Sequence, residues 1–368
     1  MTSPMTEDER WMRRAIELAS RGKGRVEPNP PVGAVIVRNG AVGGEGWHEK
    51  FGGPHAEIRA MESAKGDCSG ATLYVTLEPC TGTNKKTPPC CDAVIAARFS
   101  RIVIGSRDAT REPSIPAIQA AEIEVTTGVL EDECQRLVAP FLKLTQQGMP
   151  WVIAKWAMTA DGRTATVTGE SKWISSTESR ELVHRWRDEV DAVLVGAGTV
   201  RRDDPLLTCR IPNGRNPERI VVDSRASLSA ESALVRSVGE APLILACTES
   251  ASEERCQALA GLGVRILRGP ERNGRVDLEA VLRFLGEEQM TNLMVEGGSQ
   301  IMGELFDRGM VDEVRIFVAP KLLGGNSALP PIGGAGIRTP SEAVTLANVR
   351  WCQVGDDMLL RGDVAQRG

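Results

Sequence analysis

The sequence predicts an α/β protein made of two domains. Its 368 residues exceed the usual size of a single domain. Strand-like apolar runs alternate with helical patterns along the chain, which is typical of α/β folds. The segment Gln146-Gln147-Gly148-Met149-Pro150 is the best candidate for a linker between the domains. We therefore expect one domain over residues 1–146 and a second over residues 150–368.

Composition narrows the class of protein. Apolar residues make up 41% of the chain and charged residues 25%, which are ordinary values for a globular protein with a buried core. The net charge of -5 disfavours nucleic acid as a partner. The polar N-terminus does not resemble a signal peptide, and no apolar run is long enough to cross a bilayer. The nine cysteines are an odd number in a long chain, so we expect thiols or metal ligands in a cytoplasmic protein without a membrane partner.

The first domain is expected to begin with an amphipathic helix from Glu7 to about Arg21. Thr6-Glu7-Asp8-Glu9 has the pattern of a capping box, and apolar residues recur behind it at helical spacing. Prolines 28, 30 and 31 end this helical region. The further elements expected are a strand over Val32–Val37, a turn at Asn39-Gly40 into a strand ending at Trp47, a helix over His55–Ala64, a strand over Ala71–Leu77, a helix over Cys90–Ala97 and a strand over Arg101–Ile104.

The second domain shows the same alternation over about two hundred residues. The expected strands are Trp151–Ala157, Ala192–Val195, Arg219–Val222, Pro242–Ala246, Val264–Leu267, Leu293–Val295 and Val314–Val318. The expected helices are Thr177–Trp186, Leu278–Glu287 and Gln300–Arg308.

One stretch of the first domain carries the ligand set of a zinc site. His55, Cys80 and Cys90 supply one imidazole and two thiols, and Glu57 follows His55 by two positions. His-x-Glu followed by Pro-Cys and a further Cys is the signature of zinc-dependent nucleobase deaminases. Three protein ligands leave one position for a water whose pKa zinc lowers to about 7. We therefore expect these three residues to bind zinc and Glu57 to carry protons from that water to the substrate.

A structural zinc site is the main alternative for this stretch. It would need a fourth protein ligand, which Cys68, Cys91 or His48 could supply. His55 and Cys90 each follow a proline at an expected helix start, where the helix dipole favours a thiolate. This placement favours the catalytic interpretation.

Two glycine-containing turns stand out in the second domain, which lacks Gly-x-Gly-x-x-Gly after its first strand and so does not indicate a Rossmann site. Val195-Gly196-Ala197-Gly198-Thr199 follows one expected strand, and Val295-Glu296-Gly297-Gly298-Ser299 joins another to a helix. Such turns let backbone N–H groups approach a phosphate. From these residues alone, ordinary tight turns are an equally good interpretation.

Motifs from both domains together resemble the bifunctional riboflavin-biosynthesis deaminase–reductases, the RibD family. They follow the family's order over nearly the whole chain. The resemblance implies a cytidine-deaminase-like three-layer domain followed by a dihydrofolate-reductase-like domain. The motifs are Pro28-Asn29-Pro30-Pro31-Val32-Gly33, Gly46-Trp47-His48, Pro54-His55-Ala56-Glu57, Leu77-Glu78-Pro79-Cys80, Thr87-Pro88-Pro89-Cys90, Asp161-Gly162-Arg163, Ser171-Lys172-Trp173-Ile174, Gly198-Thr199-Val200, Asp203-Asp204-Pro205-Leu206-Leu207-Thr208 and Ala319-Pro320-Lys321-Leu322-Leu323-Gly324-Gly325.

The resemblance also implies cofactors and site residues. It places one zinc in the deaminase domain, on His55, Cys80 and Cys90, with Glu57 as proton shuttle, and NADPH in the reductase domain. The deaminase substrate positions that it implies are Asn29, His48 and Lys86. The implied NADPH positions are Ala157, Trp173, Thr199, Asp203, Ser224 and the turn and helix start from Gly298 and Ser299 to Glu304. The implied reductase substrate positions are Ser171, Arg187, Leu207, Arg210 and Glu296.

The residue types suit these roles. Two arginines fit a ribose phosphate, and a carboxylate such as Glu296 can bind sugar hydroxyls. Lys155, Asp161 and Lys321 recur in the motif blocks but are expected to lie outside the site, with Lys155 packing or capping in a strand.

The chain departs from the family pattern in two places. The loop Thr81-Gly82-Thr83-Asn84-Lys85-Lys86 lacks the family's histidine and is one residue longer. The segment after Asp108 is several residues shorter. Both departures fall on the substrate side of the expected deaminase site rather than on the metal ligands.

The resemblance implies a complete two-step function on small-molecule ribosylaminopyrimidine phosphates. The first step is zinc-dependent hydrolytic deamination of 2,5-diamino-6-(5-phosphoribosylamino)pyrimidin-4(3H)-one. The second is NADPH-dependent reduction of the ribosyl group of 5-amino-6-(5-phosphoribosylamino)uracil to ribityl, in a homo-oligomer. Two alternatives stay open from the sequence: a related pyrimidine deaminase of another pathway with an altered substrate loop, and a non-catalytic protein that binds structural zinc and NADP.

Overall fold

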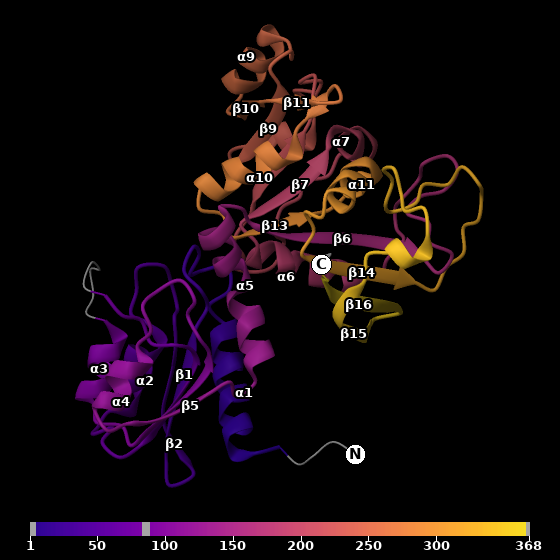
Figure 1. Ribbon diagram of the computed structural model, residues 1–368. Helices are drawn as coiled ribbons and strands as arrows, with labels where there is room; N and C mark the ends of the chain where they lie inside the picture. Colours follow the sequence, from indigo (N-terminus) through magenta and orange to yellow (C-terminus); the bar gives the residue numbers. More distant parts are fainter. Residues whose placement is uncertain (1–4, 83–88, 366–368) are drawn as a thin grey trace. The chain divides into compact units, whose positions relative to one another are not determined.

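The chain forms two compact units, Met1–Gly148 and Met149–Gly368 (Figure 1). The structure is a computed structural model that describes residues 5–82 and 89–365. The division falls inside the expected linker, but two linker residues are helical. Helix α5 (Glu131–Gln147) continues through Gln146 and Gln147 and ends at Gly148, whose left-handed backbone places its N–H on Leu144 O. The connection is therefore shorter than the sequence suggested.

The first unit is a three-layer α/β/α domain. Its sheet has the strand order β2-β1-β3-β4-β5, with β1 antiparallel to β2 and β3, and with β3, β4 and β5 parallel. Helices α1 and α5 lie on one side of this sheet and α2, α3 and α4 on the other (Figure 1). The elements are α1 (Glu7–Ser20), β1 (Gly33–Arg38), β2 (Ala41–Trp47), α2 (Ala56–Ala64), β3 (Thr72–Leu77), α3 (Cys90–Ala96), β4 (Arg101–Ser106), α4 (Ile115–Ala120), β5 (Glu124–Thr127) and α5.

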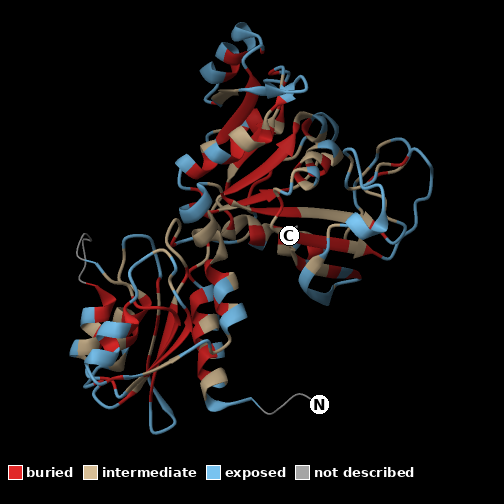
Figure 2. Cartoon of the chain, in the orientation of Figure 1, coloured by how far each residue is buried: buried red, intermediate tan, exposed pale blue. Residues whose placement is uncertain are grey.

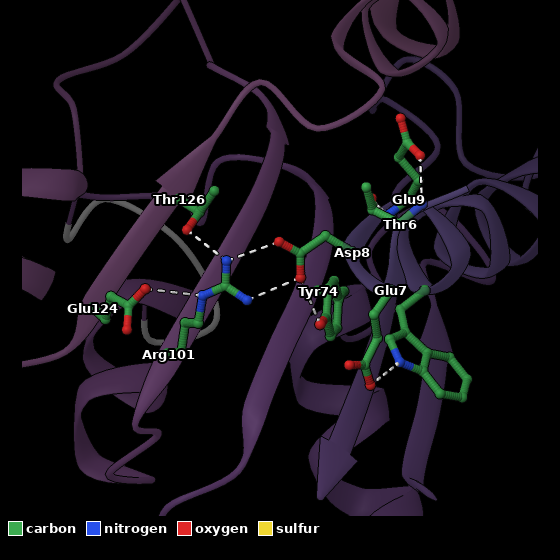
Figure 3. Close-up of polar contacts among 9 residues, drawn as sticks. Thr6, Glu7, Asp8, Glu9, Tyr74, Arg101, Glu124 and Thr126 are labelled. Carbon is green, nitrogen blue, oxygen red and sulfur yellow. Dashed lines mark hydrogen bonds and ion pairs between the residues drawn. The ribbon is translucent and has the colours of Figure 1, made fainter. Parts of the chain in front are cut away.

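The start of α1 is fastened to the sheet by polar side chains (Figure 3). The predicted capping box is present: Thr6 Oγ1 accepts from Glu9 N at 3.2 Å, and Glu9 Oε2 accepts from Thr6 N at 2.8 Å. Asp8 accepts two hydrogen bonds from Arg101 on β4, at 2.9 and 2.8 Å, and one from Tyr74 on β3 at 2.9 Å. A bidentate pair of this kind fixes orientation as well as position. The helix is therefore held against two central strands.

Two glycines allow helices to lie directly on the sheet and so set the position of α2. A Cβ atom at Gly46 of β2 would lie 2.3 Å from Ala60 N of α2, and one at Gly33 of β1 would lie 2.0 Å from Ala15 O of α1. Neither contact leaves room for a side chain, because both involve backbone atoms. The close approach at Gly46 fixes the helix that begins just after His55.

The second unit is built on a nine-stranded sheet with the order β10-β9-β8-β7-β13-β6-β14-β16-β15. The strands from β10 to β14 are parallel, and β16 and β15 add an antiparallel edge. The elements are β6 (Trp151–Thr159), α6 (Thr177–Glu189), β7 (Ala192–Gly196), α7 (Ala197–Asp203), β8 (Glu218–Val222), α8 (Ala233–Arg236), β9 (Leu243–Thr248), α9 (Glu253–Gly261), β10 (Arg265–Gly269), β11 (Glu271–Arg272), β12 (Arg275–Val276), α10 (Leu278–Glu287), β13 (Asn292–Val295), α11 (Ser299–Asp307), β14 (Glu313–Ala319), the 3-10 turn η1 (Pro340–Glu342), β15 (Leu346–Val354) and β16 (Asp357–Val364).

Apolar cores cover both faces of this sheet, and its central strands are buried (Figure 2). One core packs residues of α6, α8 and α9 on the sheet, and the other packs residues of α10 and α11. Burial on both faces explains why these strands appear in the sequence as continuous apolar runs. None of the described helices is long and apolar enough to cross a membrane.

Candidate active sites in the two units

The three expected zinc ligands converge in the first unit. His55 is the N-cap residue of α2, Cys90 is the first residue of α3, and Cys80 follows β3. His55 Nδ1 lies 3.5 Å from Cys80 Sγ and 3.2 Å from Cys90 Sγ, and all three ligand atoms lie within 4.8 Å of one another. Ligands of a tetrahedral zinc, at about 2.3 Å for sulfur and 2.0 Å for nitrogen, are separated by about 3.5 Å. The donor types and their spacing therefore fit zinc.

A fourth protein ligand is not found among the described residues, where the metal-binding cluster consists of these three side chains. Cys68 and Cys91 lie in the apolar core beneath α2 and α3. His48 is close to His55, with ring centroids 5.3 Å apart, but its own nitrogens lie near Pro54 O at 3.0 Å and Asn29 Nδ2 at 3.2 Å. A three-ligand site matches a catalytic rather than a structural zinc.

Glu57 lies beside this centre and is 3% exposed. Burial raises its pKa, which the neighbouring His55 partly opposes. The hydrogen bond from Cys90, with a second from His55, lowers the pKa of Cys80, while the same contact raises the pKa of Cys90. A carboxyl group with a raised pKa is suited to both accepting and releasing a proton near neutral pH.

The residues expected near the deaminase substrate divide into two groups. Asn29 and His48 contact each other at 3.2 Å, and His48 also borders the metal centre through His55. Burial lowers the pKa of His48, which favours the neutral imidazole. Lys86 lies outside the described residues.

Sequence reasoning did not assign a role to Glu78, which shapes the edge of this site. Glu78 Oε1 accepts from Ser114 N at 2.7 Å, from Ser114 Oγ at 3.2 Å and from Ile115 N at 3.3 Å. Thr81 Oγ1 donates to Glu112 O at 2.8 Å. The shortened segment after Asp108 is thus tied to both sides of Cys80. The available signal was a carboxylate at the end of a buried strand, directly before Pro-Cys.

In the second unit, every residue expected to bind NADPH or the reductase substrate lines one cavity of about 1360 Å³. The cavity lies where the parallel strands β7, β8 and β13 end, as ligand sites of α/β sheets commonly do. Both glycine turns face it. A Cβ atom at Gly297 would lie 3.2 Å from Thr199 Oγ1, and Gly298, with φ of 90°, forms the N-cap of α11. These helix starts provide unpaired backbone N–H groups, which fit the phosphates of a dinucleotide.

A buried ion cluster forms the inner wall of this cavity. Arg187 donates to both carboxylate oxygens of Glu296, at 2.6 and 3.0 Å, and Lys155 Nζ lies 3.6 Å from Glu296 Oε2. Burial alone would raise the pKa of Glu296, but Arg187 and Lys155 outweigh it and lower that pKa to about 2. Burial lowers the pKa of Lys155. Two cations around one carboxylate leave an excess positive charge, which suits an anionic substrate.

The position of Lys155 differs from the role expected from the sequence. The residue lies on a strand, as expected, but its ammonium group contacts Glu296 and lines the cavity. It therefore belongs among the candidate site residues. The alternation of β6 could not separate a cavity-facing lysine from a packed one, because its partner Glu296 lies far along the chain, directly after β13.

Comparisons with known proteins match both units of the chain. Residues 5–106 match the model of the cytidine and deoxycytidylate deaminase zinc-binding region, and residues 150–360 match the RibD C-terminal domain. The riboflavin biosynthesis protein RibD of Actinobacillus pleuropneumoniae is 42% identical over 95% of this chain and 93% of its own length. That of Escherichia coli strain K12 is 39% identical over 87% and 90%. The chain belongs to the RibD family.

Solved structures extend the match to the whole fold. A diaminohydroxyphosphoribosylaminopyrimidine deaminase/5-amino-6-(5-phosphoribosylamino)uracil reductase from Thermotoga maritima superposes with a TM-score of 0.83 at 37% identity, covering 98% of this chain and 99% of that one. Acinetobacter baumannii RibD gives a TM-score of 0.82 at 33% identity, covering 98% and 99%. The expected fold class is confirmed, with a cytidine-deaminase-like domain preceding a RibD C-terminal reductase domain. As a RibD-family enzyme the chain combines a zinc deaminase with a reductase, which decides against the two alternatives left open by the sequence.

Proposed function

We propose that the unit Met1–Gly148 deaminates 2,5-diamino-6-(5-phosphoribosylamino)pyrimidin-4(3H)-one, and that the unit Met149–Gly368 reduces the ribosyl group of 5-amino-6-(5-phosphoribosylamino)uracil to ribityl with NADPH. The main observation behind this proposal is that one chain contains two sites. One is a three-ligand metal centre beside a buried carboxyl group, and the other is a large cavity with a cationic inner wall. The name of the Thermotoga maritima relative, a deaminase and reductase of these two compounds, supports this substrate pair.

In the deaminase, His55, Cys80 and Cys90 would hold the zinc. When bound, zinc supplies a water acidic enough to act as the nucleophile near neutral pH. Glu57 would take one proton from the attacking water and pass it to the ring nitrogen, and would then carry the remaining hydroxyl proton to the departing amine. A C–O bond forms, the exocyclic C–N bond breaks, and ammonia leaves. The buried position of Glu57 supports this role, because burial raises its pKa toward the working range.

Asn29 and His48 would bind the pyrimidine and ribose side of the deaminase substrate. Their mutual contact at 3.2 Å, next to His55, supports a shared role. Lys86 would contribute a positive charge for the phosphate.

In the reductase, the residues expected from the family would divide between cofactor and substrate. Ala157, Trp173, Thr199, Asp203, Ser224, Gly298 and Ser299 would bind NADPH, and Ser171, Arg187, Leu207, Arg210 and Glu296 would bind the substrate. NADPH supplies a hydride to C1′ of the open-chain imine form of the ribosylamine. The position of all these residues in the lining of one cavity supports the assignment.

Lys155 is the best candidate for the proton donor of the reduction. When C1′ accepts a hydride, the imine nitrogen must take up a proton. Lys155 lines the cavity, and burial lowers its pKa, which would ease the transfer of its proton. Glu296, which is itself held by Arg187, would keep the ammonium group in place.

The proposal also covers the cellular location and the oligomeric state of the enzyme. We expect a cytoplasmic homo-oligomer, as implied by the family resemblance. The free state of all nine cysteines supports a reducing compartment.

The two-site proposal is tested by separating the activities. Glu57→Gln keeps the shape of the side chain and should abolish ammonia release from the diaminopyrimidine, while NADPH oxidation on the deaminated uracil intermediate continues at the unaltered rate. Lys155→Met should give the reverse. Loss of both activities in either folded variant would contradict the proposal of two independent sites.

A further inference from the structure

Two sequence motifs have no part in either reaction as described above. Asp161-Gly162-Arg163 follows β6, and Ala319-Pro320-Lys321 begins at the last residue of β14. Strands β6 and β14 are paired in parallel, with Thr159 opposite Ala319, so the two motifs leave the sheet side by side. Lys321 of the second motif contacts the loop 171–176, whose first five residues line the reductase cavity.

The backbone of this loop is fastened by side chains from outside it. Lys321 Nζ donates to Trp173 O and to Ile174 O, each at 2.8 Å. Arg180 Nη1 donates to Ser175 O at 2.6 Å. Three consecutive carbonyl groups are thus bound by two cationic side chains, and hydrogen bonds from charged donors are stronger than neutral ones.

The start of the loop is held separately, by the other side of the cavity. Ser171 Oγ donates to Asp203 Oδ1 at 2.9 Å, and Lys172 Nζ donates to Asp203 O at 2.8 Å. Lys321 is therefore the link that ties the middle of the loop, at Trp173, to the sheet.

Asp161 in turn holds the turn that carries Lys321. Its carboxylate accepts from Leu323 N at 3.1 Å, from Gly324 N at 2.6 Å and from Thr159 Oγ1 at 2.5 Å. The backbone of Ala160 donates to Lys321 O at 2.9 Å. The hydrogen bonds from Thr159 and from Gly324 N lower the pKa of Asp161 to about 2, so the carboxylate stays ionised. Asp161, the turn 321–324, Lys321 and the Trp173 loop form a chain of contacts in series.

The position of Trp173 gives this chain of contacts a functional meaning. Its side chain is 65% exposed, lines the cavity and carries the Arg180 guanidinium over its ring at 4.5 Å. An aromatic side chain exposed at a cavity wall offers its ring face for stacking with a planar ligand. A planar group of the cofactor would bury that surface.

We infer that Lys321 and Asp161 are positioning residues of the reductase, which hold the Trp173 loop in the shape that binds the nicotinamide cofactor. The inference rests on the proposed NADPH site. Neither residue needs to touch the cofactor. Without the link, the loop has more conformations in the free enzyme, and cofactor binding must first select the competent one. The loss therefore falls on NADPH affinity rather than on the chemical step.

The test compares Lys321→Met, Lys321→Arg, Asp161→Asn and the double variant Lys321→Met/Asp161→Asn in the full chain. Arg338→Met is the matched control, because Arg338 is an exposed cation of the same unit outside the cavity lining. The urea unfolding midpoint of each variant, compared with that of the unaltered enzyme, reports that the reductase unit has folded. The readouts are the Kd for NADPH by fluorescence titration, and the reductase KM and kcat.

We expect Lys321→Met to raise the Kd and KM for NADPH about tenfold, corresponding to a competent population of about one tenth, with kcat changed less than threefold. Asp161→Asn should show a smaller rise in the same direction. Lys321→Arg should recover part of the affinity, because its fork also offers several donors to two carbonyls. The double variant should be no worse than Lys321→Met, because the two residues act in series.

A spectroscopic readout separates this inference from the proposed function. In cofactor-free protein, Lys321→Met should change the tryptophan emission, and the change should vanish in a Trp173→Phe background. If the unaltered enzyme failed to bind NADPH while this emission change appeared, the proposed function would fail and the loop link would stand. The inference would be overturned if Lys321→Met left the Kd for NADPH unchanged or lowered only kcat. It would also be overturned if the rise in Kd of the double variant equalled the product of the two single rises.

Discussion

Replacing Glu296 by glutamine is expected to destabilise the reductase unit in a pH-dependent way. The carboxylate is 5% exposed, and Arg187 and Lys155 hold its pKa at about 2 against a reference value of 4.5. At about 1.36 kcal/mol for each pKa unit, this difference corresponds to about 3 kcal/mol of stability. Glutamine leaves both cations buried without their counter-charge. An uncompensated buried charge destabilises the folded state.

The sign of the pH dependence follows from the lowered pKa. A carboxyl group whose pKa is lower in the folded state contributes its full stabilisation above the unfolded pKa, about 4.5, and loses it as the pH falls toward about 2. The difference between the unaltered enzyme and Glu296→Gln should therefore be about 3 kcal/mol at pH 7 and should shrink steadily below pH 4.5. At neutral pH the same variant should also lose reductase activity, because Lys155 loses its partner.

The assay is urea unfolding of the full chain at a series of pH values, followed by tryptophan fluorescence. Glu342→Gln is the matched control, because Glu342 is an exposed carboxylate of the same unit, and it should shift the midpoint little. A Glu296→Gln difference below about 0.5 kcal/mol at pH 7, or one that stays constant down to pH 3, would refute the reasoning.

Three further predictions concern single groups. Lys155→Met should lower reductase kcat at least a hundredfold with ammonia release unchanged, as expected for loss of a proton donor; a kcat within threefold would exclude that role. Arg219→Met should lower the free energy of unfolding in urea by about 3 kcal/mol, because the buried guanidinium donates to Leu206 O, Ser237 Oγ and Ser237 O. The same variant should weaken substrate binding through Leu207, which follows Leu206. An unchanged free energy of unfolding would contradict this prediction. Removing zinc with a chelator should stop ammonia release while NADPH oxidation on the uracil intermediate continues, and zinc should restore the first activity; persistent ammonia release would argue against the His55, Cys80 and Cys90 centre.

The metal centre could be predicted from the sequence because its chemistry is carried by short motifs. His55 and Cys90 are placed by helix starts that follow prolines, so local rules located them. The continuous apolar runs of the central strands were equally clear, since both faces of the sheet are buried.

Groups that depend on distant partners could not be found this way. Arg187 on α6 and Glu296 after β13 lie 109 residues apart, and the role of Lys155 appears only when β6 is placed beside them. Arg219 occupies a strand position that is fully buried, where its charge is satisfied by carbonyl groups of loops 13 to 23 residues away. A sequence pattern shows a charged residue in an apolar run, but not what receives its hydrogen bonds.

Some elements were missed for local reasons. Strand β15 is exposed along most of its length, so it lacks the alternation of buried and exposed residues that marks a strand. Helix α5 contains Pro140, which normally signals a break, yet it continues to Gln147 and shortens the expected linker.

A coupled assay with the diaminopyrimidine substrate tests the central claim most directly. Purified, zinc-loaded enzyme receives 2,5-diamino-6-(5-phosphoribosylamino)pyrimidin-4(3H)-one and NADPH, and ammonia and NADPH are followed together. Two sites acting in sequence predict equal amounts of ammonia released and NADPH oxidised, with NADPH oxidation lagging behind ammonia and absent in Glu57→Gln. NADPH oxidation without a lag, or persisting when Glu57→Gln releases no ammonia, would contradict the claim.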